Sequence, residues 1–227
     1  MDRDVNISLD TTGLIILDIC GTIYDSNTTF DYIEFVLRDK PLRLFAYRVF
    51  RSLPAKVLHV IVKATLRIDL IKTLCIWLLN GFKLEDLKRK AFSFVDEQLS
   101  EQKIDIVWEM YNANKGRGCK WILLSASLDV IVSVIAERMG IKEFYSSTLA
   151  FNSGVCLGRI ENDLYGKKLP LVNNIIAREP AIDIVFVTDN KNDYCIRPYV
   201  KSFIAISNKS NLRFWKERLN HKDIYEV

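Results

Sequence analysis

The chain has 227 residues, of which 49% are hydrophobic and 26% charged, a composition typical of a globular protein with a sizeable core. Its five cysteines have neither metal-ligand nor redox-motif spacing, and its two histidines lie far apart, which argues against a zinc site and a histidine-driven triad. Residues 1–13 are polar and mixed in charge, unlike a secretory signal. Together these features predict a cytoplasmic protein with reduced thiols.

The charge is unevenly distributed along the chain. Between Arg38 and Lys90 there are 13 Lys or Arg and 4 Asp or Glu, a net charge of +9, whereas the whole chain carries +4, so the remainder carries −5. Such a segment indicates an anionic partner, either a phosphorylated substrate or a membrane surface. A solvated helix face accounts for the same charges equally well. We expect no nucleic-acid partner.

The first predicted element is a buried strand at residues 14–17, "LIIL". Residues 30–115 contain no convincing strand and show a helical period, interrupted at Pro41 and Pro54. Residues 83–100 within them form a further amphipathic pattern. An all-helical insertion is therefore predicted after the first strand, and it lacks the uncharged run of 18 residues that a transmembrane helix needs.

Strand and helix patterns alternate in the rest of the chain. Apolar runs at 121–124, 184–187 and 203–206 predict three more buried strands. Helical patterns cover 128–140, where Gly140 is a stop signal, and 169–180. This alternation predicts an α/β fold with a parallel sheet and right-handed crossovers.

Polar residues stand where these strands end. Asp18 follows the first strand, Ser125 the second, and Asp189 the third, while Lys167 and Lys168 begin a helix. Ligands bind at the carboxyl ends of parallel strands, where carboxylates suit Mg²⁺ and a hydroxyl and an ammonium suit phosphoryl oxygens. Each feature alone also fits a turn, a helix cap or a solvated lysine. Their joint order favours a magnesium and phosphate site.

Four segments resemble the motifs of the haloacid dehalogenase-like superfamily: "DICGT" its first motif DxDGT, "LLSASLDVIVSVIAERMGI" its second, "YGKKL" its lysine motif, and "VTDNKND" its acidic motif GDSxxD. The chain is most similar to the phosphoserine phosphatase-like branch with a helical cap, subfamily IB, over about residues 10–206. The resemblance implies a Rossmann-like core domain at 1–29 and 116–227. It also implies a helical cap domain at 30–115, inserted after the first strand.

The resemblance also implies roles for individual residues. Asp18 is the nucleophile, forms an aspartyl-phosphate and binds Mg²⁺ together with Asp189 and the backbone carbonyl of Cys20. Asp193 orients Asp189 or a metal-bound water. The residues that the resemblance places around the phosphate are Gly21, Thr22, Ser125, Ala126, Lys167 and Lys168. Of the two lysines, we prefer Lys168, because it gives the following helix its usual apolar register.

Cys20 departs from the family pattern, since most phosphatases of the family carry an aspartate there as general acid and base. A thiol is a weak acid, with an unperturbed pKa of about 8.5. Losing a general acid or base costs roughly 100- to 10,000-fold in rate. The simpler interpretation is that Cys20 is a small residue packed under the nucleophile. Thr188, in place of the usual glycine before Asp189, is a milder change.

The sequence therefore predicts a Mg²⁺-dependent phosphoric monoester hydrolase that acts slowly through an aspartyl-phosphate. One alternative is a relative that uses another leaving group or transfers the phosphoryl group. Another is a catalytically silent protein that binds a phosphate metabolite. The expected partner is a small phosphorylated substrate or a lipid phosphate, and the basic cap also suits peripheral contact with a membrane.

Overall fold

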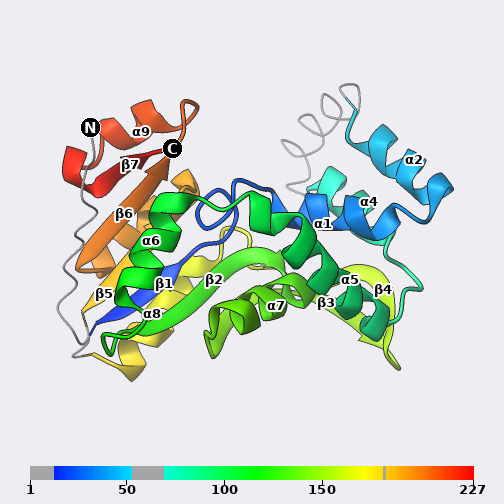
Figure 1. Ribbon diagram of the computed structural model, residues 1–227, viewed down its shortest axis with the longest axis horizontal. Coiled ribbons are helices and arrows are strands. Elements are labelled where there is room, and N and C mark those ends of the chain that lie inside the picture. The colour runs from blue at the N-terminus through cyan, green and yellow to red at the C-terminus, as the bar shows by residue number, and fades with distance from the viewer. Residues whose placement is uncertain (1–12, 53–68, 181–182) are drawn as a thin grey trace.

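The computed structural model describes residues 13–52, 69–180 and 183–227. Its centre is a seven-stranded sheet in the order β4-β3-β2-β1-β5-β6-β7, flanked by helices (Figure 1). The pairs are parallel except β3 with β4, which is antiparallel. The strands are β1 (Leu14–Leu17), β2 (Lys120–Leu128), β3 (Glu143–Asn152), β4 (Val155–Asn162), β5 (Ile184–Thr188), β6 (Ser202–Ser207) and β7 (Ile224–Glu226).

In the described part of the chain, the long connection from β1 to β2 is built of helices. It holds α1 (Thr28–Leu37), α2 (Pro41–Phe50), α4 (Leu70–Trp77), α5 (Leu84–Glu97), the 3₁₀ turn η1 (Leu99–Glu101) and α6 (Asp105–Asn114). Figure 1 shows α1, α2, α4 and α5 together at one end of the molecule. Helix α6 lies on the sheet instead, where the Tyr111 ring meets the Trp121 ring of β2 with centroids 4.9 Å apart. The division into core and cap domains stays a prediction.

The remaining helices follow the strands from β2 onward. They are α7 (Asp129–Met139), α8 (Lys168–Arg178), η2 (Lys191–Tyr199), α9 (Leu212–Lys216) and η3 (His221–Asp223). Helix α7 ends at Gly140, whose φ of 68° is the left-handed conformation that glycine adopts at little cost. The predicted start and stop of this helix are thus confirmed to within one residue.

Strand β1 lies at the centre of the sheet and is buried on both faces, because its four apolar residues point alternately into two cores. Ile15 and Leu17 belong to one buried cluster, and Leu14 and Ile16 to the other. In the ladder, Leu17 lies opposite Leu123 of β2 and Val187 of β5. The residues that follow these three positions therefore meet at one edge of the sheet, which is the arrangement expected from the sequence.

The structure differs from the predicted elements in four places. Strand β2 continues to Leu128, with a break in register after Leu124, so that Ser125 lies within the strand rather than beyond it. The sequence did not indicate β3 and β4, because polar and glycine residues interrupt their apolar pattern, or β7, because it has only three residues. Pro41 is the first residue of α2, as a helix start tolerates, whereas Pro54 lies outside the described residues.

The unpredicted β3–β4 hairpin connects the sheet to the helices of the β1–β2 connection. The backbone N–H of Gly81 donates to Cys156 O at 2.9 Å, and the N–H of Cys156 donates to Phe82 O at 2.8 Å. Lys72 of α4 pairs with Asp163, just after β4, at 2.8 Å. Within the described residues, no helix is long and apolar enough to cross a membrane.

Candidate active site

A cleft of about 860 Å³ opens at the carboxyl ends of the central strands. The sheet edge supplies one wall, and the helical connection supplies the other through Phe30, Asp31, Asp69 and Lys72. Predicted site residues that line the cleft are Asp18, Cys20, Gly21, Ser125, Ala126, Lys168 and Asp189. The sheet register thus brings together residues that are far apart in sequence.

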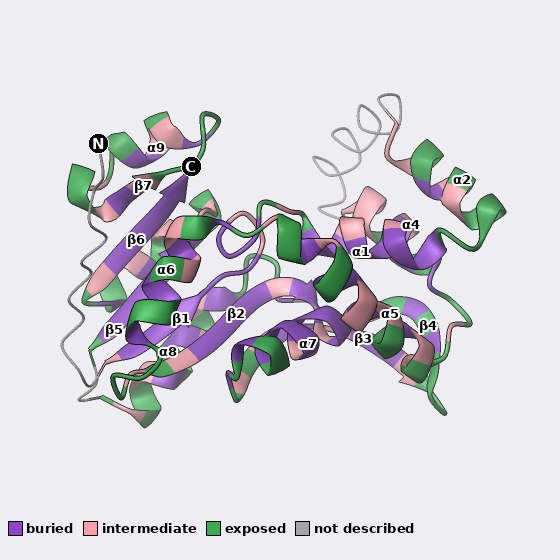
Figure 2. Ribbon diagram, in the orientation of Figure 1, coloured by how far each residue is buried: buried purple, intermediate pink, exposed green. Residues whose placement is uncertain are grey.

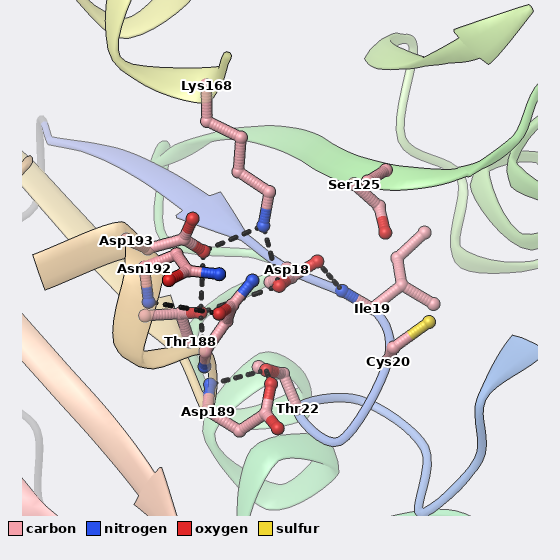
Figure 3. A network of polar contacts seen from close by, with 12 residues as sticks. Asp18, Ile19, Cys20, Thr22, Ser125, Lys168, Thr188, Asp189, Asn192 and Asp193 are labelled. Atoms are coloured by element: carbon pink, nitrogen blue, oxygen red, sulfur yellow. Dashed lines mark hydrogen bonds and ion pairs between the residues drawn. The ribbon is translucent and has the colours of Figure 1, made fainter. Parts of the chain in front are cut away.

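Asp18 lies at the end of β1 and is only 3% exposed. Its backbone N–H donates to Val187 O of β5 at 3.0 Å, which fixes the residue between β1 and β5. Its carboxylate oxygen Oδ1 accepts from the N–H of Ile19 at 2.7 Å. Its other oxygen, Oδ2, lies 2.6 Å from Lys168 Nζ (Figure 3). One buried carboxylate is therefore held by a backbone donor and an ammonium.

Lys168, the first residue of α8, connects two carboxylates. Its Nζ lies 2.7 Å from Asp193 Oδ2 in addition to its contact with Asp18. Burial alone would lower the pKa of Lys168, but the charges of Asp18 and Asp193 outweigh burial and raise this pKa. Lys167 is exposed and does not line the cleft. The geometry therefore favours Lys168 as the lysine that a substrate would meet.

Thr188 ends β5 beside the same carboxylates. Its hydroxyl donates to Asp193 Oδ2 at 2.8 Å and lies 3.4 Å from Asp18 Oδ2. The N–H of Asn190 in turn donates to Thr188 Oγ1 at 3.0 Å. Burial raises the pKa of Asp193, with a further contribution from the charge of Asp18. The hydroxyl of Thr188 thus supplies a hydrogen bond at the centre of the site.

Residues 20–22 form a tight turn that holds Asp189. Gly21 has φ = 65°, and a Cβ atom there would lie 2.3 Å from Asp189 Oδ2, so only glycine fits. The N–H of Asp189 donates to Thr22 Oγ1 at 2.9 Å, and the Thr22 hydroxyl lies 3.3 Å from Asp189 Oδ1. Asn211 Nδ2 donates to Asp189 O at 3.0 Å from the loop after β6.

The charges of this group suit a divalent cation. Burial, followed by the charge of Asp18, raises the pKa of Asp189 to about 7. The Lys168 ammonium pairs with the carboxylates of Asp18 and Asp193, and it makes no ion pair with the third carboxylate, that of Asp189. Carboxylate oxygens are the ligands that Mg²⁺ prefers.

Side chains alone do not complete a metal site in the described part of the chain. There, no three His, Cys, Asp or Glu side chains gather as metal ligands. A cation between Asp18 and Asp189 therefore needs backbone, water or substrate oxygens as its remaining ligands, which is usual for Mg²⁺.

The Cys20 thiol is enclosed by hydroxyl groups. Its sulfur lies 2.9 Å from Thr28 Oγ1 and 3.1 Å from Ser127 Oγ, and these two oxygens are 2.6 Å apart. Ser125 Oγ continues this chain, 3.1 Å from Ser127 Oγ. Burial, with a smaller contribution from the Asp18 charge, raises the pKa of Cys20. The thiol therefore stays protonated at neutral pH, and in Figure 3 it points away from Asp18.

Most of the described basic residues in the 38–90 segment lie away from the cleft. Among the described residues of that segment, only Asp69 and Lys72 line it, and Lys72 is paired with Asp163. Two further acids, Asp25 and Asp31, also line the cleft. Within the described part of the segment, Lys72 is therefore the one basic residue at the cleft.

Four residues of the site escaped the sequence reasoning: Thr28, Ser127, Asn211 and, in its bridging role, Thr188. Ser127 and Thr188 lie in the quoted motifs, but nothing in the sequence indicated what they contact. Thr28 and Asn211 lie outside the motifs, and only the fold brings them to the site.

A model of the haloacid dehalogenase-like hydrolase family matches residues 15–196 of this chain. A search of the curated proteins found no match. Among solved structures, a protein of unknown function from Bordetella pertussis Tohama I is similar, with a TM-score of 0.67 and 17% identity over 89% of this chain and 93% of that one.

Two phosphoserine phosphatase structures also share the fold. One, a phospho-aspartyl intermediate analogue, has a TM-score of 0.62 and 19% identity over 95% of this chain and 93% of its own. The other, a substrate-bound complex, has a TM-score of 0.59 and 17% identity over 86% of both chains. The family match spans most of the chain, including every motif of the site, and so the protein belongs to the haloacid dehalogenase-like hydrolase family.

Proposed function

We propose that the protein is a Mg²⁺-dependent phosphoric monoester hydrolase in which Asp18 carries the phosphoryl group. One observation supports this most directly: the buried Asp18 carboxylate lines the cleft and lies 2.6 Å from the Lys168 ammonium. It is also near enough to Asp189 for its charge to raise the pKa of that residue. A nucleophile, a phosphate-binding cation and a second acid thus share one sheet edge. Similarity to phosphoserine phosphatases supports the same reaction class.

In this reaction an Asp18 oxygen attacks phosphorus, and the bond from phosphorus to the leaving alcohol breaks. Lys168 and Ser125 hold phosphoryl oxygens, and Gly21 lets the turn approach closely. Mg²⁺ bound by Asp18, Asp189 and the Cys20 carbonyl would neutralise charge on the phosphoryl group. Asp193 is a positioning residue, because it holds the Lys168 ammonium.

We expect the steps that need proton transfer to be slow at this site. The leaving alcohol must gain a proton, and the water that later cleaves the aspartyl-phosphate must lose one. A thiol with a raised pKa does neither well, so we expect slow turnover of alkyl phosphates. A good leaving group needs less protonation, because the phosphoryl transition state is loose.

Two alternatives remain open. A relative that uses another leaving group, or passes the phosphoryl group to an acceptor, would not need a general acid and base at position 20. A catalytically silent protein that binds a phosphate metabolite would keep Lys168 and Ser125 as phosphate contacts. The three acids around Lys168 argue against the silent protein, since a purely phosphate-binding cleft gains nothing from carboxylates that repel the ligand.

The substrate is proposed by class only. A small phosphorylated molecule fits a cleft of about 860 Å³, and the substrate-bound phosphoserine phosphatase among the similar structures supports this choice. A lipid phosphate is the second candidate, which requires a cap that reaches a membrane surface. A cytoplasmic location, peripheral to a membrane in the second case, goes with these proposals.

The test is a panel of alkyl and aryl phosphates assayed with Mg²⁺ and with EDTA. We expect hydrolysis that requires Mg²⁺, and we expect Asp18→Asn to abolish it while the fold is retained. Asp25→Asn is the matched control, because Asp25 is an exposed acid that lines the same cleft. Activity that persists in Asp18→Asn, or in EDTA, would rule out the mechanism. Phosphate binding without turnover would indicate the silent protein.

A further inference from the structure

Helix α2 presents two different faces. Its inner face carries Tyr47, which is 1% exposed and donates its hydroxyl to Phe30 O at 2.8 Å. Arg43 on the same side donates to Leu78 O at 3.0 Å and to Asn80 O at 2.8 Å. These contacts fix the rotation of the helix, so its opposite face must point away from the protein.

That outer face is apolar. Leu42, Phe45 and Val49 are spaced three and four residues apart, which places them on one stripe of the helix. They are 86%, 69% and 46% exposed. Figure 2 shows α2 at the end of the molecule with much of its surface exposed. Single exposed apolar residues are common, but three on one stripe of a ten-residue helix are unusual and indicate a partner.

The charges around the stripe indicate what kind of partner. Arg43 and Arg51 are directed inward, to Leu78 O and to the Tyr47 hydroxyl. The exposed basic residues beside the stripe are therefore Lys40 and Arg48. Arg48 is 67% exposed and makes a long ion pair with the partly exposed Glu34, at 3.9 Å. Lys40 is also exposed at the helix start. An apolar stripe bordered by basic residues is the pattern of helices that lie in the interface of an anionic bilayer.

We propose that α2 docks on an anionic lipid bilayer, with Leu42, Phe45 and Val49 inserted among the acyl chains and Arg48 and Lys40 at the headgroups. The helix would lie in the plane of the membrane, because ten residues are too few to cross it. This surface is separate from the catalytic cleft, so the proposal does not depend on the proposed reaction.

A second copy of the chain is a poorer occupant for the same face. A ten-residue helix is only about 15 Å long. One face of it is too small to supply the roughly 800 Å² that a stable interface covers on each partner. A two-fold dimer through α2 would also bring identical surfaces together, and the exposed Lys40 and Arg48 of the two copies would then repel each other. Area and charge therefore both favour lipid.

The experiment is sedimentation of the full chain with vesicles of phosphatidylcholine alone or mixed with phosphatidylserine, at low and moderate salt. We expect binding to the mixed vesicles that weakens with salt. The double variant Leu42→Ser/Phe45→Ser should lower the partition coefficient at least about tenfold, since each side chain loses its apolar contact with lipid. Arg48→Glu should lower it about fivefold or more.

Tyr199→Ser is the matched control, because Tyr199 is 52% exposed in η2 of the other part of the molecule. It should bind like the wild type, and thermal unfolding should show that all variants fold. The proposal would be overturned if the wild type bound neither kind of vesicle, or if the double variant bound the mixed vesicles as strongly as the wild type. A dimer in light scattering that the double variant dissociates would assign the face to a second copy instead.

Discussion

The sulfur of Cys20 lies 2.9 Å from the hydroxyl oxygen of Thr28, inside a group of hydroxyls completed by Ser127. A thiol makes weak hydrogen bonds, so these hydroxyls are better partners than the sulfur can use. A carboxylate at position 20 would accept from both. The surroundings of Cys20 thus suit an acid, although the residue itself is not one.

We therefore expect Cys20→Asp to raise the hydrolysis of alkyl phosphates by about tenfold or more. The new carboxylate would find donors in Thr28 and Ser127 and could transfer protons to the leaving alcohol and from water. Activated aryl phosphates should gain less, because their leaving groups need little protonation. Steady-state rates for both substrate types measure this difference.

Cys20→Ser is the control, because a serine keeps the contacts with Thr28 and Ser127 but adds no acid. It should show no comparable gain. In the wild type, mass spectrometry after a rapid acid quench should detect phosphorylated Asp18, because slow attack by water lets the intermediate accumulate. Wild-type rates on alkyl phosphates that equal those of Cys20→Asp would mean that another group supplies the proton transfers.

A second prediction concerns the two adjacent lysines. Lys168→Met should abolish activity and lower the free energy of unfolding by about 3–5 kcal/mol at neutral pH, because Asp18 and Asp193 lose their buried ammonium. Lys167→Met should change stability by no more than about 0.5 kcal/mol, because Lys167 is exposed. Urea unfolding measures both changes. A larger loss in Lys167→Met would contradict the assignment of Lys168.

A third prediction concerns pH and Mg²⁺. The pKa of Asp189 is about 7 in the folded protein, against an ordinary value of 3.8. An acid with a raised folded-state pKa stabilises the fold below its unfolded pKa, and this contribution is lost as pH rises through the folded value. Its full size is on the order of 4 kcal/mol. Without metal, stability should therefore fall between about pH 4 and pH 7.

Mg²⁺ should offset this loss by pairing with the ionised carboxylate. The rise in Tm caused by Mg²⁺ should therefore be larger at about pH 8 than at about pH 5. Thermal unfolding in Mg²⁺ and in EDTA at both values measures it. Asp189→Asn should remove most of the dependence on pH and Mg²⁺. An equal rise in Tm in this variant would place the cation elsewhere.

The sequence predicted the frame of the site better than its interior. Buried strands such as 14–17 have a strong apolar signal, and parallel strands bring their ends to one edge, so Asp18 and Asp189 could be expected to lie near each other. Thr28 is different, because it reaches Cys20 only through the path of the chain after β1. No local pattern encodes such a contact.

The charge pattern was informative in an unexpected place. The basic segment predicted an anionic partner, which is consistent with a phosphate in the cleft, but Lys72 is its only described basic residue that lines the cleft. The outward stripe of α2 could not be recognised from spacing alone, because Leu42 and Phe45 fit a buried helix face equally well. Only the inward contacts of Tyr47 and Arg43 decide which face is exposed.

A final prediction tests the turn that holds Asp189. Gly21→Ala introduces a Cβ atom 2.3 Å from Asp189 Oδ2 at a residue whose φ is 65°, so both the backbone and the carboxylate must shift. Gly140→Ala is a matched control, because Gly140 has φ = 68° and nothing within 4 Å of the added atom. The control should lose about 1 kcal/mol of stability through backbone conformation alone. Gly21→Ala should lose more, and the displaced Asp189 should also reduce the rise in Tm that Mg²⁺ produces, which the control keeps. If the two substitutions had equal effects on stability and on the Mg²⁺-induced rise in Tm, the Asp189 side chain could move without cost, and the turn would not fix its position.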